Sequence, residues 1–158
     1  MKLTDIVVSD AIITDLKADQ RDDVVAEMVD ALIAAGVIEA DHRQTIIDSV
    51  LSREKKGSTG FGRGVAVPHV KHDSARGLSA AIGLSKGGID FNALDQEPVY
   101  IVFLLLSPAD NPEEHLQAME VIFKNLSNEV FRRFLRQATT VDDVTTLLDE
   151  ADNNQLGG

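Results

Sequence analysis

The chain has 158 residues, which suits one domain that buries roughly 70% of its unfolded surface on folding. Its formal net charge is −11, from 26 acidic and 15 basic residues, so nucleic acid and anionic lipid are repelled and are not expected as partners. Cysteine is absent, which excludes disulfides and thiolate nucleophiles and fits a reducing compartment.

Apolar segments are too short for a membrane protein. The longest run, residues 99–106, cannot cross a bilayer, and the first residues lack the apolar core of a signal peptide. We therefore expect a cytoplasmic protein without direct membrane insertion. No repeat or linker interrupts the sequence before its polar end, so one domain is predicted over residues 1–151 and a flexible tail over residues 152–158.

Two amphipathic helices are predicted early in the chain. The first begins after Asp19, a candidate N-cap, and ends at Gly36, a candidate C-terminal glycine. The second begins at Asp41, where Gln44 completes a potential capping box, and runs towards Arg53. The Arg53 guanidinium suits phosphate oxygens, but a cation at the end of a helix is also stabilised there without any function.

A glycine-rich loop follows, because residues 57–64 contain four glycines. The loop lacks the Gly-Lys-Ser/Thr ending of a nucleotide-binding P-loop. It leads into a short β-prone run, residues 65–67, which Pro68 ends because proline cannot donate to a strand ladder. Pro68 thus restrains the chain immediately before His69.

Further strands are predicted over residues 79–85 and 98–106. The second is apolar on both alternating faces, as in a central strand that helices cover on both sides. Three helices, over residues 112–126, 129–137 and 141–149, then close the domain. Helices at both ends of a run of strands indicate a single α/β domain with a mixed central sheet and helices on both faces.

Histidines supply the candidate chemistry. His42 and His72 lie in polar surroundings and are interpreted as solvated surface side chains. His69 follows a buried-looking strand, and ligands of α/β sheets bind beyond the carboxyl ends of strands. A neutral imidazole there is a candidate nucleophile, although a histidine that merely ends the strand is the alternative, and the local sequence leaves both open.

His115 is placed by strong helix-start signals. Asn111 is a good N-cap and Pro112 suits the first helical position, so His115 falls in the first turn. The positive end of the helix dipole disfavours an imidazolium, and a neutral ring is expected. His115 shares a flank with Met119 and Ile122, so a purely structural histidine is the alternative. No histidine or carboxylate spacing is typical of a metal site.

Four segments together resemble the fructose/mannitol/nitrogen-regulatory class of enzyme IIA of the phosphoenolpyruvate-dependent phosphotransferase system. They are Arg53-Glu54, Gly57-Ser58-Thr59-Gly60-Phe61-Gly62, Gly64-Val65-Ala66-Val67-Pro68-His69 and His115-Leu116. The resemblance spans nearly the whole chain. It departs from the family at Val70, where a small residue is usual, and a β-branched side chain tolerates a positive φ poorly.

The resemblance implies a role for each site residue. His69 would take a phosphoryl group on its Nε2 from the phosphohistidine of an HPr-like carrier. His115 would be the second active-site histidine, and Arg53 the nearby cation. The hydroxyl of Ser58 or Thr59 would support the phosphate. No metal or cofactor is expected.

Two functions follow from the resemblance. In the first, phospho-His69 passes its phosphoryl group to a cysteine of an enzyme IIB in fructose- or mannitol-type sugar uptake. In the alternative, the protein is a nitrogen-type regulator whose phosphorylation state at His69 controls binding to target proteins. A third and different interpretation is a sugar-phosphate- or nucleotide-binding enzyme that uses the glycine-rich loop.

Overall fold

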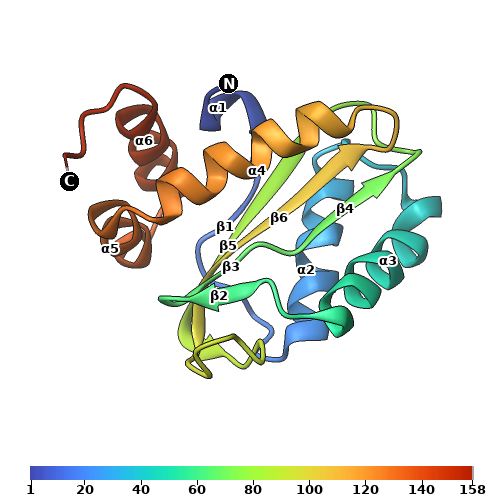
Figure 1. The fold of residues 1–158 in the computed structure, drawn as a ribbon, viewed down its shortest axis with the longest axis horizontal. Helices are drawn as coiled ribbons and strands as arrows, with labels where there is room; N and C mark the ends of the chain where they lie inside the picture. Colours follow the sequence, from blue (N-terminus) through green and yellow to red (C-terminus); the bar gives the residue numbers. More distant parts are fainter. Residues whose placement is uncertain (158) are drawn as a thin grey trace.

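A mixed sheet of six strands forms the centre of the computed structural model, which describes residues 1–157 (Figure 1). The strand order is β1-β5-β6-β3-β2, and β4 also pairs with β6. The strands are β1 (Val7–Ile13), β2 (Gly60–Gly62), β3 (Val65–Ala66), β4 (His69–His72), β5 (Ser79–Ile89) and β6 (Val99–Pro108).

Helices cover both faces of the sheet (Figure 1). They are α1 (Leu3–Ile6), α2 (Arg21–Ala34), α3 (Arg43–Lys56), α4 (Pro112–Leu126), α5 (Glu129–Gln137) and α6 (Val141–Asp152), with a short 3₁₀ turn at Ala40–His42. One core cluster joins α2 and α3 to one face of the sheet, and a second joins α1, α4, α5 and α6 to the other. The predicted α/β fold, with a mixed sheet between helices in a single domain, is confirmed.

Strand β6 is the central strand that its apolar sequence predicts. Its side chains alternate between the two core clusters, with Val102 and Leu104 on the α2–α3 side and Ile101 and Phe103 on the other. It pairs antiparallel with β5 and parallel with both β3 and β4. Burial on both faces excludes polar side chains from most of the strand.

Pro68 divides one side of β6 into two strands. β3 ends at Ala66, as the prediction of a strand ended by Pro68 requires. The Pro68 carbonyl still accepts a hydrogen bond from the backbone N–H of Leu105, at 3.0 Å. The chain therefore stays beside β6 and starts β4 at His69, which is opposite Leu105. A strand starting at His69 was not predicted from the sequence.

Two predicted helix starts are wrong by one or two residues. Helix α2 has Gln20 at its N-cap, not Asp19, and α3 begins at Arg43 after the 3₁₀ turn, without a capping box at Asp41. Gly36 does take the left-handed backbone expected after a helix, with φ +79°. By contrast, α4 and α5 have the predicted bounds, because Asn111 and Asn128 both cap their helices with side-chain hydrogen bonds.

The C-terminal segment contacts the rest of the domain. The Asp152 carboxylate accepts hydrogen bonds from the backbone N–H of Leu3, at 2.7 Å, and from Thr4. Further along, the Asn128 side chain donates to the Gly157 carbonyl, at 2.8 Å. Gly158 lies outside the described residues, and the flexibility of the 152–158 tail stays a prediction. Within residues 1–157, no helix has both the length and the hydropathy that a bilayer span needs.

Candidate active site

The structure brings His69 and His115 together. Their ring centroids lie 5.5 Å apart, with 52° between the ring planes. His69 begins β4, which runs parallel to β6, and α4 starts shortly after β6 ends. The carboxyl end of the central strand therefore delivers the first turn of α4, with His115, beside the residue that follows Pro68.

The hydrogen bond of His69 decides which of its nitrogens is reactive. Its Nδ1 lies 2.8 Å from the carbonyl oxygen of Val67. A carbonyl only accepts, so Nδ1 carries the hydrogen and Nε2 keeps its lone pair. Burial lowers the pKa of His69, and the charges of Arg53 and Lys71 lower it further against the opposing effects of Val67 and Glu54. The ring is therefore neutral near pH 7, with a nucleophilic Nε2.

His115 is a buried and uncharged partner. Its side chain is only 5% exposed, and its Nδ1 lies 2.6 Å from the hydroxyl oxygen of Ser107, which is fully buried at the end of β6. Burial, followed by His69 and Lys71, lowers the pKa of His115 to about 4. When the Ser107 hydroxyl donates to Nδ1, the hydrogen of the neutral ring lies on Nε2. His115 can then offer a hydrogen bond to an anion without giving up a proton.

Arg53 supplies positive charge near His69. It lies in the last turn of α3, and its exposed guanidinium donates to the Gly57 carbonyl at 2.8 Å. Its charge is close enough to lower the pKa of His69, as is that of Lys71 on β4. Lys71 was not singled out from the sequence, and only its place two residues after His69 on a strand could have suggested it.

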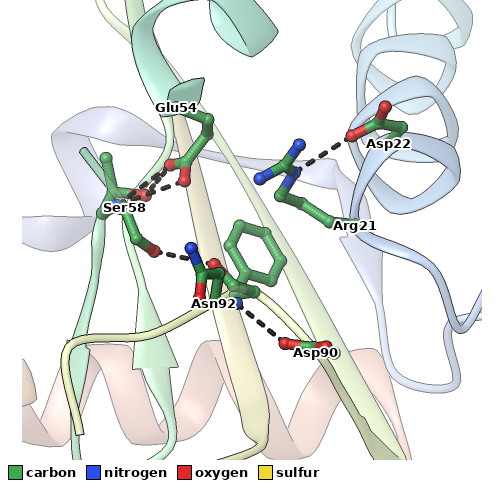
Figure 2. A network of polar contacts seen from close by, with 8 residues as sticks. Arg21, Asp22, Glu54, Ser58, Asp90 and Asn92 are labelled. Carbon is green, nitrogen blue, oxygen red and sulfur yellow. Dashed lines mark hydrogen bonds and ion pairs between the residues drawn. The ribbon is translucent and has the colours of Figure 1, made fainter. Parts of the chain in front are cut away.

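The loop residues Ser58 and Thr59 have structural hydrogen bonds. The Ser58 hydroxyl donates to the Phe91 carbonyl, at 2.8 Å, and accepts from Gly60 N–H at 3.0 Å. Both the hydroxyl and the backbone N–H of Thr59 donate to the Glu54 carboxylate, which reaches from α3 onto the loop beside Ser58 (Figure 2). Support of a phosphate by either hydroxyl stays a prediction.

Glu54 has a structural role that the sequence did not predict. It is 3% exposed and lies in α3 next to Arg53. A buried carboxylate is costly unless it accepts hydrogen bonds, and here the loop supplies them. Glu54 thus ties the glycine-rich loop to the helix that carries Arg53, and its charge raises the pKa of His69 against the effect of burial.

Val70 does not disturb the site. It lies within β4, opposite Leu106, and is absent from the residues with positive φ. Its side chain is buried in the core cluster on the α2–α3 side. The chain after His69 is therefore a strand that suits a β-branched residue, and no strained turn is needed.

The other two histidines form a separate pair. The rings of His42 and His72 lie 5.8 Å apart, edge to face, and both side chains are half-buried. They are therefore surface side chains that are only partly solvated. Within residues 1–157, no group of three or more histidine, aspartate or glutamate side chains is placed to hold a metal ion.

An exposed apolar side chain follows His115 in the chain. Leu116 follows His115 in α4 and is 62% exposed, in a helix whose opposite side packs into the core. An exposed leucine next to a site histidine suits a surface on which a protein partner docks.

Comparison with known proteins assigns the family. The family model described as "Phosphoenolpyruvate-dependent sugar phosphotransferase system, EIIA 2" matches residues 5–151. The chain therefore belongs to this phosphotransferase-system EIIA family. Membership implies a role in phosphoryl transfer between proteins.

The relatives include fructose-specific PTS components and nitrogen regulatory proteins. The chain is 31% identical over 96% of its length to the PTS system fructose-specific EIIABC component of Bacillus subtilis, of which it spans only 24%. It is 36% identical to the Nitrogen regulatory protein of Pseudomonas aeruginosa, over 83% of this chain and 84% of that protein. Among solved structures, Nitrogen Regulatory Protein IIA-Ntr from Neisseria meningitidis has a TM-score of 0.82 and 26% identity, covering 91% of this chain and 97% of that one.

Proposed function

We propose that the protein is a cytoplasmic phosphocarrier that accepts a phosphoryl group from an HPr-like carrier on His69 and passes it to a cysteine of an enzyme IIB. The observation that carries this proposal is the hydrogen bond from His69 Nδ1 to the Val67 carbonyl, which leaves the Nε2 lone pair free beside the His115 ring. The fructose-specific name of the Bacillus subtilis relative supports the sugar-uptake form of this role.

Acceptance is a displacement at phosphorus. The Nε2 lone pair of His69 forms a bond to phosphorus while the bond from phosphorus to the donor's histidine nitrogen breaks and returns its electron pair to that ring. Charge spreads over the three equatorial oxygens during this transfer. The Arg53 guanidinium and an Nε2–H of His115 are suited to stabilise that charge.

In onward transfer, phospho-His69 is the donor and a cysteine of the partner is the acceptor. A thiolate of the partner attacks the phosphorus, the bond from His69 Nε2 breaks, and the ring recovers its lone pair. His69 is a good leaving group because Nδ1 keeps its hydrogen, donated to the Val67 carbonyl, so that the ring leaves as a neutral imidazole. The pKa of about 4 keeps His115 neutral, so His115 stabilises charge by a hydrogen bond and transfers no proton.

The second candidate is a regulatory phosphoprotein that uses the same histidine. It is favoured by the Nitrogen regulatory protein of Pseudomonas aeruginosa, which the chain matches over most of both lengths. The two functions diverge after phosphorylation. A transport component loses its phosphate to a soluble enzyme IIB within seconds, whereas a regulator keeps it and a target protein binds one phosphorylation state preferentially.

Labelling of purified variants tests the shared step. Incubation with phosphoenolpyruvate, enzyme I and HPr is expected to put one acid-labile phosphate on the protein and none on His69→Ala. The matched control is His72→Ala, which removes a nearby half-buried histidine on the same strand and is expected to be labelled normally. Labelling that survives the loss of His69, or that is lost with His72, contradicts the proposal.

A further inference from the structure

Four arginines line one hollow on the surface, far from the histidines. The hollow has a volume of about 480 Å³ and is lined by residues of α5 and by Arg63, which lies in the turn between β2 and β3. Figure 1 shows where these elements lie. We call it the arginine hollow, and its lining is Arg63, Arg132, Arg133, Arg136, Glu129 and Gln137. Four guanidiniums thus face a single carboxylate in a chain whose net charge is −11.

None of these arginines is neutralised by an ion pair. Across residues 1–157, the arginines with a carboxylate oxygen within 4.0 Å are Arg21, Arg43 and Arg76. The chain has 26 acidic residues, so carboxylates are not scarce. Four like charges that gather around one counter-charge, Glu129, raise the free energy of the empty site, and an anion that binds there lowers it.

Neutral contacts hold two of the guanidiniums in place. Arg132 donates from Nη1 to the Leu126 carbonyl, at 2.8 Å. The Arg136 guanidinium lies 3.8 Å from the ring centroid of Tyr100. Stacking on an aromatic face orders a guanidinium but leaves its N–H groups, which lie in its plane, free to donate elsewhere. Both cations are therefore positioned without losing their charge.

The fourth cation reaches the hollow from a strained position. Arg63 lies between Gly62 and Gly64 and has φ +61°, in the left-handed region that a non-glycine residue rarely adopts. Its backbone N–H donates to the Asp95 carboxylate, at 3.1 Å, which helps to hold this conformation. Glycine would relieve the strain, yet the position carries a cation.

The arginine hollow is separate from the histidine site. Tyr100, beneath Arg136, lies near the start of β6, whereas His69 is opposite Leu105 on the same strand. At about 3.3 Å per residue, the two places are roughly 16 Å apart along the strand. A ligand in the hollow therefore does not occupy the position of a phosphoryl group on His69.

We propose that the arginine hollow binds a small polyphosphorylated anion. The planar guanidinium fork matches pairs of phosphate oxygens, and several forks in one hollow suit a ligand with more than one phosphate. The volume lies in the range of about 300–1,000 Å³ that is typical of small-ligand sites. A small ligand contacts only the basic hollow, whereas a large acidic partner also meets the repulsion of the remaining negative surface.

Calorimetric titration of the full chain with inorganic pyrophosphate tests the proposal. Saturable binding at one site is expected, with inorganic sulfate much weaker because it offers a single anionic centre. Arg132→Gln combined with Arg136→Gln is expected to weaken pyrophosphate binding at least about tenfold, because two charge-assisted contacts are lost. The matched control is Arg43→Gln, since Arg43 pairs with Asp30 on the surface of α3.

A second variant keeps the test decisive if the double variant folds poorly. Arg63→Gly removes a cation and the backbone strain together, so it is expected to fold at least as well as the parent and to bind pyrophosphate several-fold more weakly. Labelling of His69 is expected to be normal in this variant. Binding that Arg63→Gly and the double variant leave unchanged overturns the proposal, as does absence of saturable pyrophosphate binding or tighter binding of an acidic peptide than of pyrophosphate.

Discussion

The molecule contains two histidine pairs with similar ring distances but opposite hydrogen-bond directions at Nδ1 of the strand histidine. The rings of His69 and His115 lie 5.5 Å apart, and those of His42 and His72 lie 5.8 Å apart. The two strand histidines, His69 and His72, differ in the backbone group that contacts their Nδ1. His69 Nδ1 faces the Val67 carbonyl, which only accepts, whereas His72 Nδ1 accepts from the backbone N–H of Ser74, at 3.1 Å.

These contacts set opposite tautomers. A neutral His69 carries its hydrogen on Nδ1 and has a lone pair on Nε2, whereas a neutral His72 must carry its hydrogen on Nε2. Only the first ring can attack phosphorus with Nε2. We therefore expect two histidines three residues apart on one strand to differ in reactivity, because Nδ1 donates to a carbonyl in His69 and accepts from Ser74 in His72.

The largest expected difference between the two pairs comes from removing the ring that partners each strand histidine, His115 in one pair and His42 in the other. His115→Ala is expected to leave phosphate acceptance by His69 detectable and to slow onward transfer about 100-fold, the usual cost of losing one preorganised donor to a developing anion. His42→Ala removes the corresponding partner of His72 and is expected to leave the rate unchanged. Rapid-quench measurements of phosphate loss to a soluble enzyme IIB give both rates, and equal effects of the two variants contradict the assignment.

A smaller effect is expected from the serines that contact each pair. Ser107→Ala removes the hydroxyl that orients His115, and a net loss of about 1 kcal/mol slows transfer by roughly five- to tenfold. Ser74→Ala removes the hydroxyl beside His72 and is expected to have no effect on transfer.

The ¹⁵N shifts of the imidazoles check the tautomers directly and without any partner protein. His115 is expected to be in the Nε2–H form in the parent and a mixture of both forms in Ser107→Ala. An unchanged His115 spectrum, or an Nδ1–H form in the parent, contradicts the orienting role of Ser107.

Acid is expected to destabilise the protein partly through His115. Its pKa in the folded state is about 4, below the ordinary 6.5, so the unfolded chain binds more protons between these values. Stability from this residue is present above about pH 6.5 and is lost as the pH falls towards 4. The free energy of unfolding, measured in urea, is expected to fall less between pH 7 and pH 4.5 in His115→Asn than in the parent. An equal fall in both proteins contradicts this account.

The smallest expected effect is electrostatic. Arg53→Gln removes a charge that lowers the pKa of His69, so this pKa is expected to rise while staying below its ordinary value, because burial is the larger cause. An NMR titration of the imidazole measures the shift. As a control, Arg43→Gln removes a charge elsewhere on α3 and is expected to leave the pKa of His69 unchanged. A fall in the pKa of His69 when Arg53 is replaced contradicts the position assigned to the Arg53 charge.

Much of the fold could be predicted from local signals. Helix α4 was predicted correctly because Asn111 and Pro112 define a helix start almost alone. Strand β1 was missed because exposed Ser9 and Asp10 interrupt its apolar pattern, and because its pairing with β5 is irregular between Val7 and Ile12. Strand β2 was hidden within the glycine-rich loop, where pairing with β3 depends on a partner and not on local propensity.

The sequence by itself determined the central strand, the first turn of α4 and the position of His69 behind Pro68, because each depends on residues that are neighbours in the chain. Only the tertiary structure decided that His69 meets His115, that the Val67 carbonyl sets its tautomer, and that Ser107 and Glu54 support the site. It likewise brought Arg63 to the arginines of α5. The contacts of His69 with His115 and of Arg63 with α5 join segments far apart in sequence, whereas the hydrogen bonds of Val67, Ser107 and Glu54 join residues close in the chain. In both cases the distances and hydrogen-bond directions exist only once the sheet and its helices have packed.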